Sequence, residues 1–502
     1  MNIRDRLTHG FFYIFTGRVG AGLLTVLVTP IIVRVLGSGG YGDYAFALAV
    51  YSMLRTVAGG GVYEGARKYI AEKADGAAQE AVFYYYLKIS ALFGTITAGT
   101  LLVVTYLAVG TVILEPRHRT YLYLVAGMVF FHAFYHLVRS ALMGYNLEEY
   151  SEPLYVLNRV FFPLVGIPLA VAGWHVAGIL VGHLISTLLV VLIGYGALLR
   201  YTSITLGSLR QLLPRPAVLR SPMFRYGILN VVFVLITKSL YVTDILLLQA
   251  FVPSEEVGYY NAALVAAELL WFVPMALQLV LLHSASRLWA DGRLDDITAM
   301  AGTITRYTLL LAGSLAVVLA VIGEGFLPIY FGSEFTASYL PMVLLLPGVV
   351  GFAVARPIYA IGQGHGNMRA LVATTGAAAV INVVGNVLLI PSFGMYGAAV
   401  ATSIGYGSMV VFHVVTAHHL GFDPLHRVPL VRIAVTCLGP LPILWVVYDL
   451  IGSAVVGVVL VSLLAVPGFV VLARGLGVIS RQEFEECRGM LRRRLLGRSA
   501  PR

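Results

Sequence analysis

Residues 176–199 read VAGILVGHLISTLLVVLIGYGALL, and this run contains no aspartate, glutamate, lysine or arginine. An α-helix of about 20 apolar residues crosses the hydrocarbon of a bilayer. Because hydrocarbon offers the backbone no hydrogen-bond partner, a spanning segment must pair its own N–H and C=O groups, as a helix does. The run therefore predicts a membrane-spanning helix.

The composition of the whole chain points the same way. Of its 502 residues, 59% are hydrophobic and only 12% are charged, whereas a soluble domain carries roughly 25% charged residues. The net charge of +10 would indicate nucleic-acid binding in a soluble protein. Here the basic residues lie in short loops and tails, where they set membrane orientation. We therefore expect the lipid bilayer as the main surrounding and no nucleic-acid partner.

Apolar runs of spanning length recur along the chain, and the segments are too long and too continuous for the alternating strands of a β-barrel. The sequence predicts an all-α, polytopic membrane protein of about fourteen transmembrane helices. The expected spans are 10–35, 43–63, 81–110, 121–140, 153–173, 176–199, 226–250, 258–282, 299–322, 340–361, 371–390, 397–417, 431–449 and 452–474.

The loop charges predict the orientation of these spans. If the N-terminus is cytoplasmic and the spans alternate, nearly all loop arginines and lysines fall on the cytoplasmic side, and the opposite side receives only Arg117 and Arg119. This asymmetry is the positive-inside pattern. It favours an even number of spans with both termini in the cytoplasm.

The longest internal loop divides the chain into two groups of six spans followed by two more. The strings YGDYAFAL at 41–48 and VGYYNAAL at 257–264 open the second helix of each half. They suggest an internal duplication with the substrate site between the repeats, although small residues also simply let helices pack closely. The expected parts are an N-terminal lobe 1–200, a cytoplasmic linker loop 201–225, a C-terminal lobe 226–420, a final helix pair 421–476 and a basic cytoplasmic tail 477–502.

Three basic residues lie deep inside the predicted spans. Arg18 is about eight residues into the first span, Arg55 lies at a similar depth in the second, and Lys238 lies near the middle of the seventh. No carboxylate stands one helical turn from any of them. A buried cation needs a partner, so we expect these three to face a watery cavity for an anionic substrate, the alternative being structural pairing with distant acids.

Four other arginines fall near the ends of the predicted spans, and their long stems can carry the guanidinium to the interface. Snorkelling or packing at a helix end is the expectation for each. They are Arg34, Arg159, Arg306 and Arg356.

Two acids, Asp244 and Glu268, fall in the outer half of the seventh and eighth spans. Intramembrane acids serve in proton and ion relays, and they also form plain pairs with basic residues of other helices. Asp244 and Glu268 are therefore candidates for loading a coupling H⁺ or Na⁺, with pairing as the equal alternative.

The sequence offers no catalytic residues, metal site or cofactor fingerprint. His132 and His136 have the i, i+4 spacing of metal ligands, but no third ligand is near, so aromatic packing is favoured. We expect a transporter that is not an enzyme and that needs no cofactor other than a coupling ion.

Four local strings, in this order and at these helix boundaries, resemble the polysaccharide-transport branch of the multidrug/oligosaccharidyl-lipid/polysaccharide flippase superfamily. The resemblance covers nearly the whole chain and includes the helix count. The strings are LGSGGYGDYA at 36–45, VGYYNAA at 257–263, YFGSEF at 330–335 and IPSFGMYGAA at 390–399.

The resemblance implies two helical lobes that expose a central cavity to one side and then the other. It implies a polyprenyl lipid that carries a sugar through a phosphate or diphosphate, moved across the plasma membrane of a prokaryote for surface glycan synthesis. Membrane enzymes of glycan assembly are then the expected partners. In related flippases, cavity arginines of the first two helices meet the headgroup, and Arg18 and Arg55 match these in type and helix.

Two rival functions remain open. A cation-coupled multidrug exporter of the same superfamily would want an anionic cavity, whereas the deep residues here are mostly basic. A membrane glycosyltransferase or polysaccharide polymerase would need a large extramembrane catalytic loop, and the outer loops are short.

Overall fold

The computed structural model describes residues 3–59, 61–73, 75–108, 115–204 and 222–485, and every regular element in them is a helix. By proximity the chain forms two compact units, Met1–Asn261 with Asn386–Ala398, and Ala262–Gly385 with Ala399–Arg502. The helices are α1 (Ile3–Gly59), α2 (Val62–Ala71), α3 (Gly76–Ala108), α4 (Pro116–Gly144), α5 (Glu148–Leu169), the π-helical turn η1 (Ala170–Trp174), α6 (His175–Tyr201), α8 (Pro222–Phe251), α9 (Ser254–Glu268), the 3₁₀ turn η3 (Leu269–Trp271), α10 (Phe272–Ala290), α11 (Leu294–Phe331), the 3₁₀ turn η4 (Ser333–Ser338), α12 (Tyr339–His365), α13 (Met368–Leu420), α14 (Leu430–Leu438), α15 (Leu441–Leu450) and α16 (Ala454–Gly475).

The described residues contain eleven helical stretches long and apolar enough to cross a membrane. Three of them, Gly22–Ala71, Glu148–Tyr201 and Arg369–Leu420, are 50, 54 and 52 residues long. A helix of 50 residues measures about 75 Å, more than twice the hydrocarbon thickness of about 30 Å. Counting each of these three as two spans gives fourteen, which confirms the predicted fold class.

Each of the three long stretches is interrupted by a glycine with a positive φ. Gly37 (φ 69°, ψ 177°) divides α1, Gly173 (φ 99°) lies in η1 between α5 and α6, and Gly394 (φ 54°, ψ −134°) divides α13. Glycine adopts such angles without the penalty that a Cβ brings. These positions therefore let one span end and the next begin with almost no loop.

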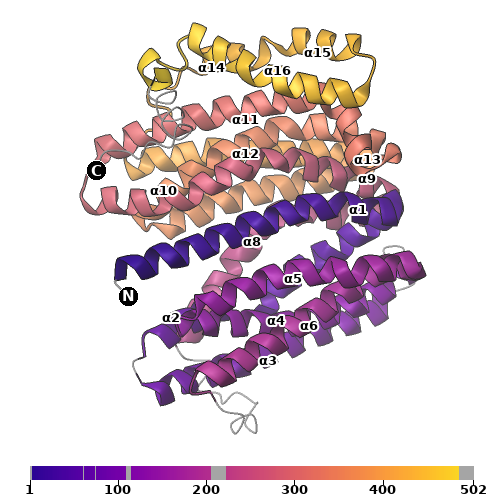
Figure 1. Ribbon diagram of the computed structural model, residues 1–502, viewed down its shortest axis with the longest axis vertical. Helices are drawn as coiled ribbons and strands as arrows, with labels where there is room; N and C mark the ends of the chain where they lie inside the picture. Colours follow the sequence, from indigo (N-terminus) through magenta and orange to yellow (C-terminus); the bar gives the residue numbers. More distant parts are fainter. Residues whose placement is uncertain (1–2, 60, 74, 109–114, 205–221, 486–502) are drawn as a thin grey trace. The chain divides into compact units, whose positions relative to one another are not determined.

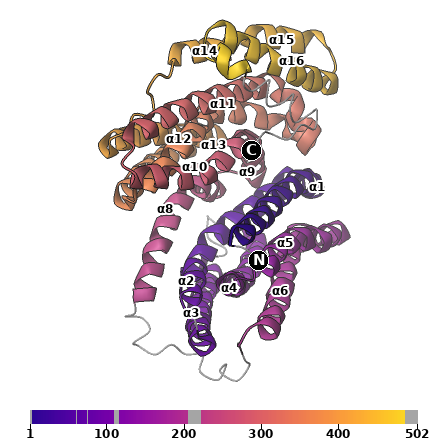
Figure 2. The same cartoon turned by 60° about the vertical axis from the view of Figure 1, so that its left-hand side comes forward.

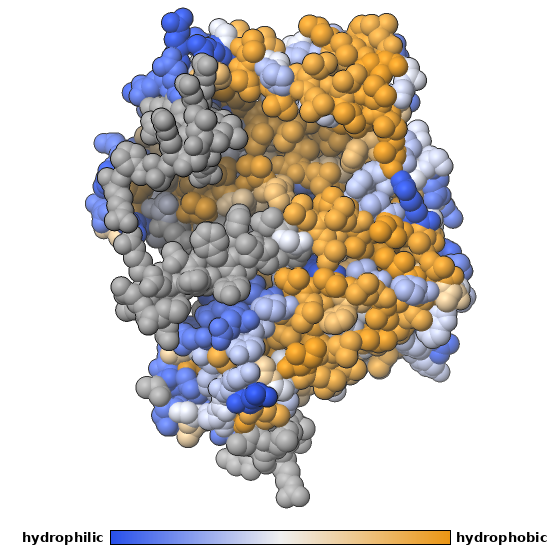
Figure 3. All heavy atoms as spheres, viewed as in Figure 1, coloured by the Kyte–Doolittle hydropathy of each residue, from blue (hydrophilic) through white to orange (hydrophobic). Residues whose placement is uncertain are grey.

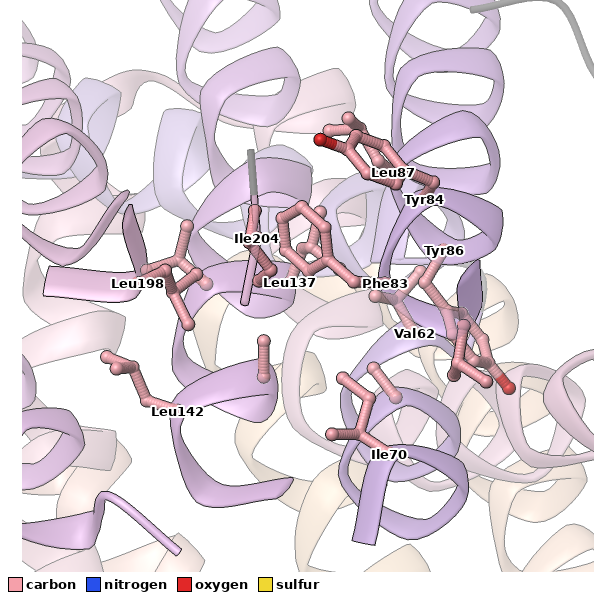
Figure 4. Packing of buried hydrophobic residues seen from close by; sticks show 14 of the residues in the cluster. Val62, Ile70, Phe83, Tyr84, Tyr86, Leu87, Leu137, Leu142, Leu198 and Ile204 are labelled. Carbon is pink, nitrogen blue, oxygen red and sulfur yellow. The ribbon is translucent and has the colours of Figure 1, made fainter. Parts of the chain in front are cut away.

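Unit 1, Met1–Asn261 with Asn386–Ala398, has an apolar core where α2, α3, α4 and α6 meet. Figure 4 shows Phe83 of α3 and Leu137 of α4 pointing toward one another beside Ile204, close to where α6 ends. Ile70 and Leu142 are fully buried in the same cluster. This packing holds the ends of α2, α3, α4 and α6 together.

Two repeated strings meet directly within unit 1. A Cβ added to Gly42 of α1 would lie 1.8 Å from the carbonyl oxygen of Ser254, and one added to Gly258 would lie 2.1 Å from that of Ser38. Each glycine follows its serine by four residues, so the contact has the same form in both directions. Close packing explains the small residues here, and the reciprocal contact also supports the duplication that the strings suggested.

Unit 2, Ala262–Gly385 with Ala399–Arg502, is built around α10, α11 and α12. Figures 1 and 2 show α14, α15 and α16 along α11, whose apolar residues pack with theirs in two clusters. The final helix pair expected from the sequence at 431–449 and 452–474 appears as α14 with α15 and as α16.

The helices expose apolar side chains along their length. Figure 3 shows orange, hydrophobic residues over the middle of the helices and blue residues near their ends. Leu388 and Leu463 are 69% and 65% exposed, which would be costly in water. The chain is a multi-pass membrane protein.

In unit 2, the segment that follows α16 is tied to α11. Arg306 of α11 forms an ion pair with Glu483, and the backbone N–H of Ser480 donates to the same carboxylate at 2.8 Å. Partial burial alone would raise the pKa of Glu483, but hydrogen bonds from Ser480, Tyr307 and Arg306 outweigh it and lower that pKa to about 2.

The close contacts of Gly42 and Gly258 can be tested by substitution. Replacing either with alanine should lower the stability of the protein by about 1–3 kcal/mol or more, because the added methyl overlaps a backbone oxygen. Thermal unfolding in detergent measures this loss. The control is Gly99→Ala in α3, where nothing lies within 4 Å of the new Cβ; equal melting temperatures for all three variants would contradict the close contact.

The ion pair of Glu483 predicts a pH-dependent stability. A carboxylate whose pKa is lowered in the folded state stabilises the protein above its ordinary value near 4.5 and loses that effect as the pH falls toward about 2. Glu483→Gln should therefore melt below the wild type at pH 5 to 8, and the difference should shrink below about pH 4.5. A difference independent of pH from 3 to 8 would show that the charge is unimportant.

Candidate functional site

The best candidate site lies on the second segment of α1 in unit 1. The ammonium of Lys238 in α8 donates to the hydroxyl of Ser52 at 2.8 Å. Arg55 follows Ser52 by three residues, so both lie on one face of the helix, and its guanidinium lies 5.4 Å from the ring centroid of Tyr51. The charged groups of Lys238 and Arg55, which come from helices far apart in the sequence, are thus brought to adjacent turns of α1.

Neither cation has an acid beside it. Among the described residues, no carboxylate oxygen lies within 4.0 Å of Arg55 or Lys238. A positive charge at this depth costs roughly 2.5–3.5 kcal/mol on insertion scales, and a serine hydroxyl and one aromatic ring offset only part of that. The arrangement can hold an anion, since an anion would supply the missing charge.

The third predicted cation, Arg18, belongs by its backbone to α1, but its side chain lies outside the described part of the structure. Its role in anion binding stays a prediction. The structure thus brings together two of the three predicted binding residues, Arg55 and Lys238.

A paired arginine shows what structural compensation looks like in the same unit. Arg139 of α4 and Glu152 of α5 form an ion pair of 2.9 Å, and both residues are buried. The guanidinium of Arg139 also donates to the carbonyl of Ser151 at 3.2 Å. This cation is fully compensated within the protein and is unavailable to a ligand.

Arg159 of α5 is a cation that the sequence analysis assigned wrongly. Helix α5 begins at Glu148, so Arg159 is about 16 Å from its start and about 15 Å from its end. It is half-buried, and its guanidinium lies 5.7 Å from the ring of Tyr155. Its position in the middle of the helix excludes the predicted snorkelling.

Arg356 of α12 departs from the same expectation. Its guanidinium lies 4.7 Å from each of the rings of Trp271 and Phe352, and it donates to Gln278 at 3.3 Å. Cation–π contacts with these two adjoining rings, whose centroids are 4.9 Å apart, hold it inside unit 2. Arg34, in contrast, is exposed on α1 as expected.

The two acids proposed for ion coupling have different surroundings. Asp244 is fully buried in unit 1, where Tyr260 donates to one carboxylate oxygen and the backbone N–H of Ile245 donates to the other at 2.8 Å. Glu268 ends α9 in unit 2 and is half-buried. Their role in coupling stays a prediction.

A buried polar cluster that the sequence did not reveal surrounds Asp43 in unit 1. Asp43 accepts hydrogen bonds from Ser254 at 2.6 Å and from His118 at 3.1 Å, and Arg117 pairs with it at 3.3 Å. Gln249 of α8 donates to Ser254 at 3.1 Å. This Asp43 cluster joins α1, α4, α8 and the start of α9 beside the crossing of Gly42 and Gly258.

The Asp43 cluster contains serine, histidine and aspartate but is not arranged for nucleophilic catalysis. The backbone N–H of Glu115 donates to Nδ1 of His118 at 3.1 Å, so Nε2 carries the proton and donates to Asp43. Ser254 donates to Asp43 itself, and a nucleophilic serine would instead donate to the histidine. The cluster is therefore a hydrogen-bonded contact between helices.

All residues of the candidate site fall within the part of the chain that matches one family model. The model, described as polysaccharide biosynthesis protein, matches residues 7–280, more than half of the chain. The chain belongs to this family. The membership confirms the resemblance to polysaccharide flippases on which the sequence analysis relied.

This chain has relatives in archaea. It is 25% identical over 481 residues to the probable flippase AglR of Haloferax volcanii, covering 89% of this chain and 94% of the relative. It is 29% identical over 182 residues to the probable low-salt glycan biosynthesis flippase Agl15 of the same organism, covering 35% of this chain and 37% of the relative. With Agl15 the chain thus aligns over only about a third of the relative's length.

Solved structures share the fold. The lipid II flippase MurJ in an inward closed conformation has a TM-score of 0.74 at 12% identity, with 92% of this chain and 97% of that chain covered. An inward-facing multidrug resistance transporter of the MATE family has a TM-score of 0.66 at 15% identity, with 79% and 94% covered. Both show that this chain has the same fold as these membrane proteins.

The contrast between paired and unpaired arginines can be tested. Arg139→Gln leaves the buried carboxylate of Glu152 without its cation, a loss that costs about 3–5 kcal/mol in buried pairs, so its melting temperature in detergent should fall clearly. Arg55→Gln removes an uncompensated charge and should leave the melting temperature equal or higher. The opposite ranking would show that Arg55 is structural.

Proposed function

We propose that the protein is a flippase that moves a lipid-linked oligosaccharide across the cytoplasmic membrane by alternating access. The substrate carries its sugar on a polyprenyl phosphate or diphosphate. The observation that supports this most is the pair Arg55 and Lys238, which has no acid within 4.0 Å among the described residues and lies beside Ser52 within the spans.

The chemistry of this pair suits a phosphate linkage. The planar guanidinium of Arg55 can donate two parallel hydrogen bonds to phosphate oxygens, and the ammonium of Lys238 adds a second charge. A sugar headgroup would remain in water within the lobes while the prenyl chain stays in lipid. The names of the relatives AglR and Agl15, both probable flippases, support the same class of cargo.

The repeated architecture supports alternating access. Transporters built from repeats rock one half against the other around a site between them. The reciprocal contact of Gly42 with Ser254 and of Gly258 with Ser38 joins the two repeated strings. The Asp43 cluster lies at the same contact, where Ser254 and His118 donate to Asp43, so opening at this end would have to break these hydrogen bonds.

Orientation and coupling complete the proposal. The positive-inside pattern favours a cytoplasmic N-terminus and C-terminus in the plasma membrane of a prokaryote, with glycan-assembly enzymes of the same membrane as partners. A driving H⁺ or Na⁺, if used, would load at Asp244 or Glu268, because intramembrane acids serve such relays. No other cofactor is proposed.

The rival transporter function is export of cationic drugs. The similarity to a MATE transporter shows the fold alone, and an exporter of cations would gain nothing from the unpaired positive charges of Arg55 and Lys238. A glycosyltransferase or polymerase is less well supported, since such an enzyme would need a large extramembrane catalytic loop and the outer loops between the expected spans are short.

A transport assay tests the proposal. Purified protein in liposomes should move fluorescent short-chain polyprenyl diphosphate N-acetylglucosamine between leaflets. Arg55→Gln and Lys238→Gln should each slow transport about 10- to 100-fold, since a hydrogen bond to a charged group is worth about 1.5–3 kcal/mol. Lys88→Gln, which removes a half-buried cation of α3, is the control. A wild type that moves neither this probe nor its monophosphate counterpart, yet exports cationic dyes, would replace the proposal with the rival.

A further inference from the structure

We propose that Arg159 is a second station for the phosphate, to which the substrate passes after leaving Arg55 and Lys238. The inference rests on the proposed function and adds a step within it. It assigns a transport role to a residue of α5, separate from the first site on α1 and α8.

The orientation of Arg159 is the first observation. Leu164, on the same helix, is 63% exposed and marks the lipid-facing side. Five residues separate the two, so their side chains point about 140° apart around the helix. Arg159 therefore faces away from that side, toward the inside of unit 1, where it is half-buried.

The neighbours of Arg159 place it beside α1. Phe162, three residues later on the same face of α5, stacks on the ring of His183 at a centroid distance of 4.0 Å. His183 in turn is hydrogen-bonded to the hydroxyl of Tyr44 of α1 at 2.9 Å. Arg159 stands one turn, about 4.5 Å, before Phe162 on α5, and α5 packs against α1, so Arg159 lies close to the stretch of α1 around Tyr44.

The order of these residues along α1 gives the step a direction. Tyr44 and Tyr51 are seven residues apart, which is two turns on one face and about 10 Å. Arg55 lies about 6 Å beyond Tyr51. Through Phe162 and His183, Arg159 lies near Tyr44 in the part of α1 closer to the Gly37 break, whereas Lys238 and Arg55 occupy the part around Ser52. In the predicted orientation the Gly37 break is on the outer side, so Arg159 is the outer of the two cationic positions.

The availability of Arg159 is the last observation. Within the described ranges, no carboxylate oxygen comes within 4.0 Å of its guanidinium. Arg139 lies 5.0 Å from the same Tyr155 ring, yet it has Glu152 as a partner. A guanidinium can keep its face on an aromatic ring while its edge donates to phosphate oxygens, so Tyr155 can hold Arg159 in place without blocking it.

The two stations predict different kinetic defects. A residue of the first station sets how much substrate is needed, so Arg55→Gln and Lys238→Gln should raise the half-saturating probe concentration. A residue reached only during transfer affects the rate after binding. Arg159→Gln should therefore lower the maximal rate at least tenfold and change the half-saturating concentration less than threefold.

The experiment uses full-length protein in liposomes and two probes, fluorescent short-chain polyprenyl diphosphate N-acetylglucosamine and the corresponding monophosphate. Arg159→Lys keeps a positive charge and should recover at least half of the wild-type rate with whichever probe the wild type moves. Lys88→Gln controls for the loss of any cation from unit 1. Only variants that elute as the wild type does in size-exclusion chromatography and melt within a few degrees of it are compared.

The outcomes separate this inference from the proposed function. Arg159→Gln at the wild-type rate, or with its whole defect in the half-saturating concentration, overturns the second station and leaves the flippase function intact. The same holds if Arg159→Lys is as slow as Arg159→Gln, since the side chain would then matter for packing and not for charge. A wild type that moves neither probe overturns the proposed function and this step with it.

Discussion

A positive charge inside hydrocarbon must find a compensating partner, and this constraint organises the first unit of the protein. Arg139 meets it with the buried carboxylate of Glu152. Arg55, Lys238 and Arg159 meet it only in part, with a hydroxyl and aromatic rings. The difference separates cations that are compensated within the protein from those that we propose to bind an anion. The distinction matters more in a bilayer than in water, because forming or losing an ion pair that is exposed to water changes the stability of a protein only slightly.

The fold was largely predictable because hydrophobic length is a local signal. Each span is visible in its own 20 residues, so the count of fourteen needed no knowledge of tertiary contacts. What the sequence could not show was how adjacent spans are joined. At Gly37, Gly173 and Gly394 one span is followed by the next with almost no loop between them, whereas hydropathy predicts separate segments. The strings at 41–48 and 257–264 hinted at a duplication, but only the reciprocal contact of Gly42 and Gly258 gives it a physical form.

The site was predictable where depth alone decides. Arg55 and Lys238 lie well inside the expected spans 43–63 and 226–250, so their predicted depth depends little on small errors in the boundaries, and their role in binding an anion stays a prediction. The predicted depth of Arg159 was wrong, because the expected span began at 153 whereas α5 begins at Glu148. Those five additional residues place Arg159 in the middle of the helix and not near its end. The Asp43 cluster was not predicted from the sequence. Its hydrogen bonds join residues 75 and 211 positions apart, and no local pattern marks such partners.

The Asp43 cluster and the cationic positions divide two tasks along one helix. Near the Gly37 break, α1 is held to α4, α8 and α9 by hydrogen bonds to a fully partnered aspartate. Toward Gly59, the same helix presents Ser52, which accepts from Lys238, and Arg55, which has no carboxylate oxygen within 4.0 Å among the described residues. Charge satisfied within the protein can hold a closed contact in the absence of substrate, whereas charge left unsatisfied favours the entry of an anion. In the flippase that we propose, the first task keeps one end of α1 packed whether or not cargo is bound, and the second makes binding near the other end depend on the negative charge of the cargo.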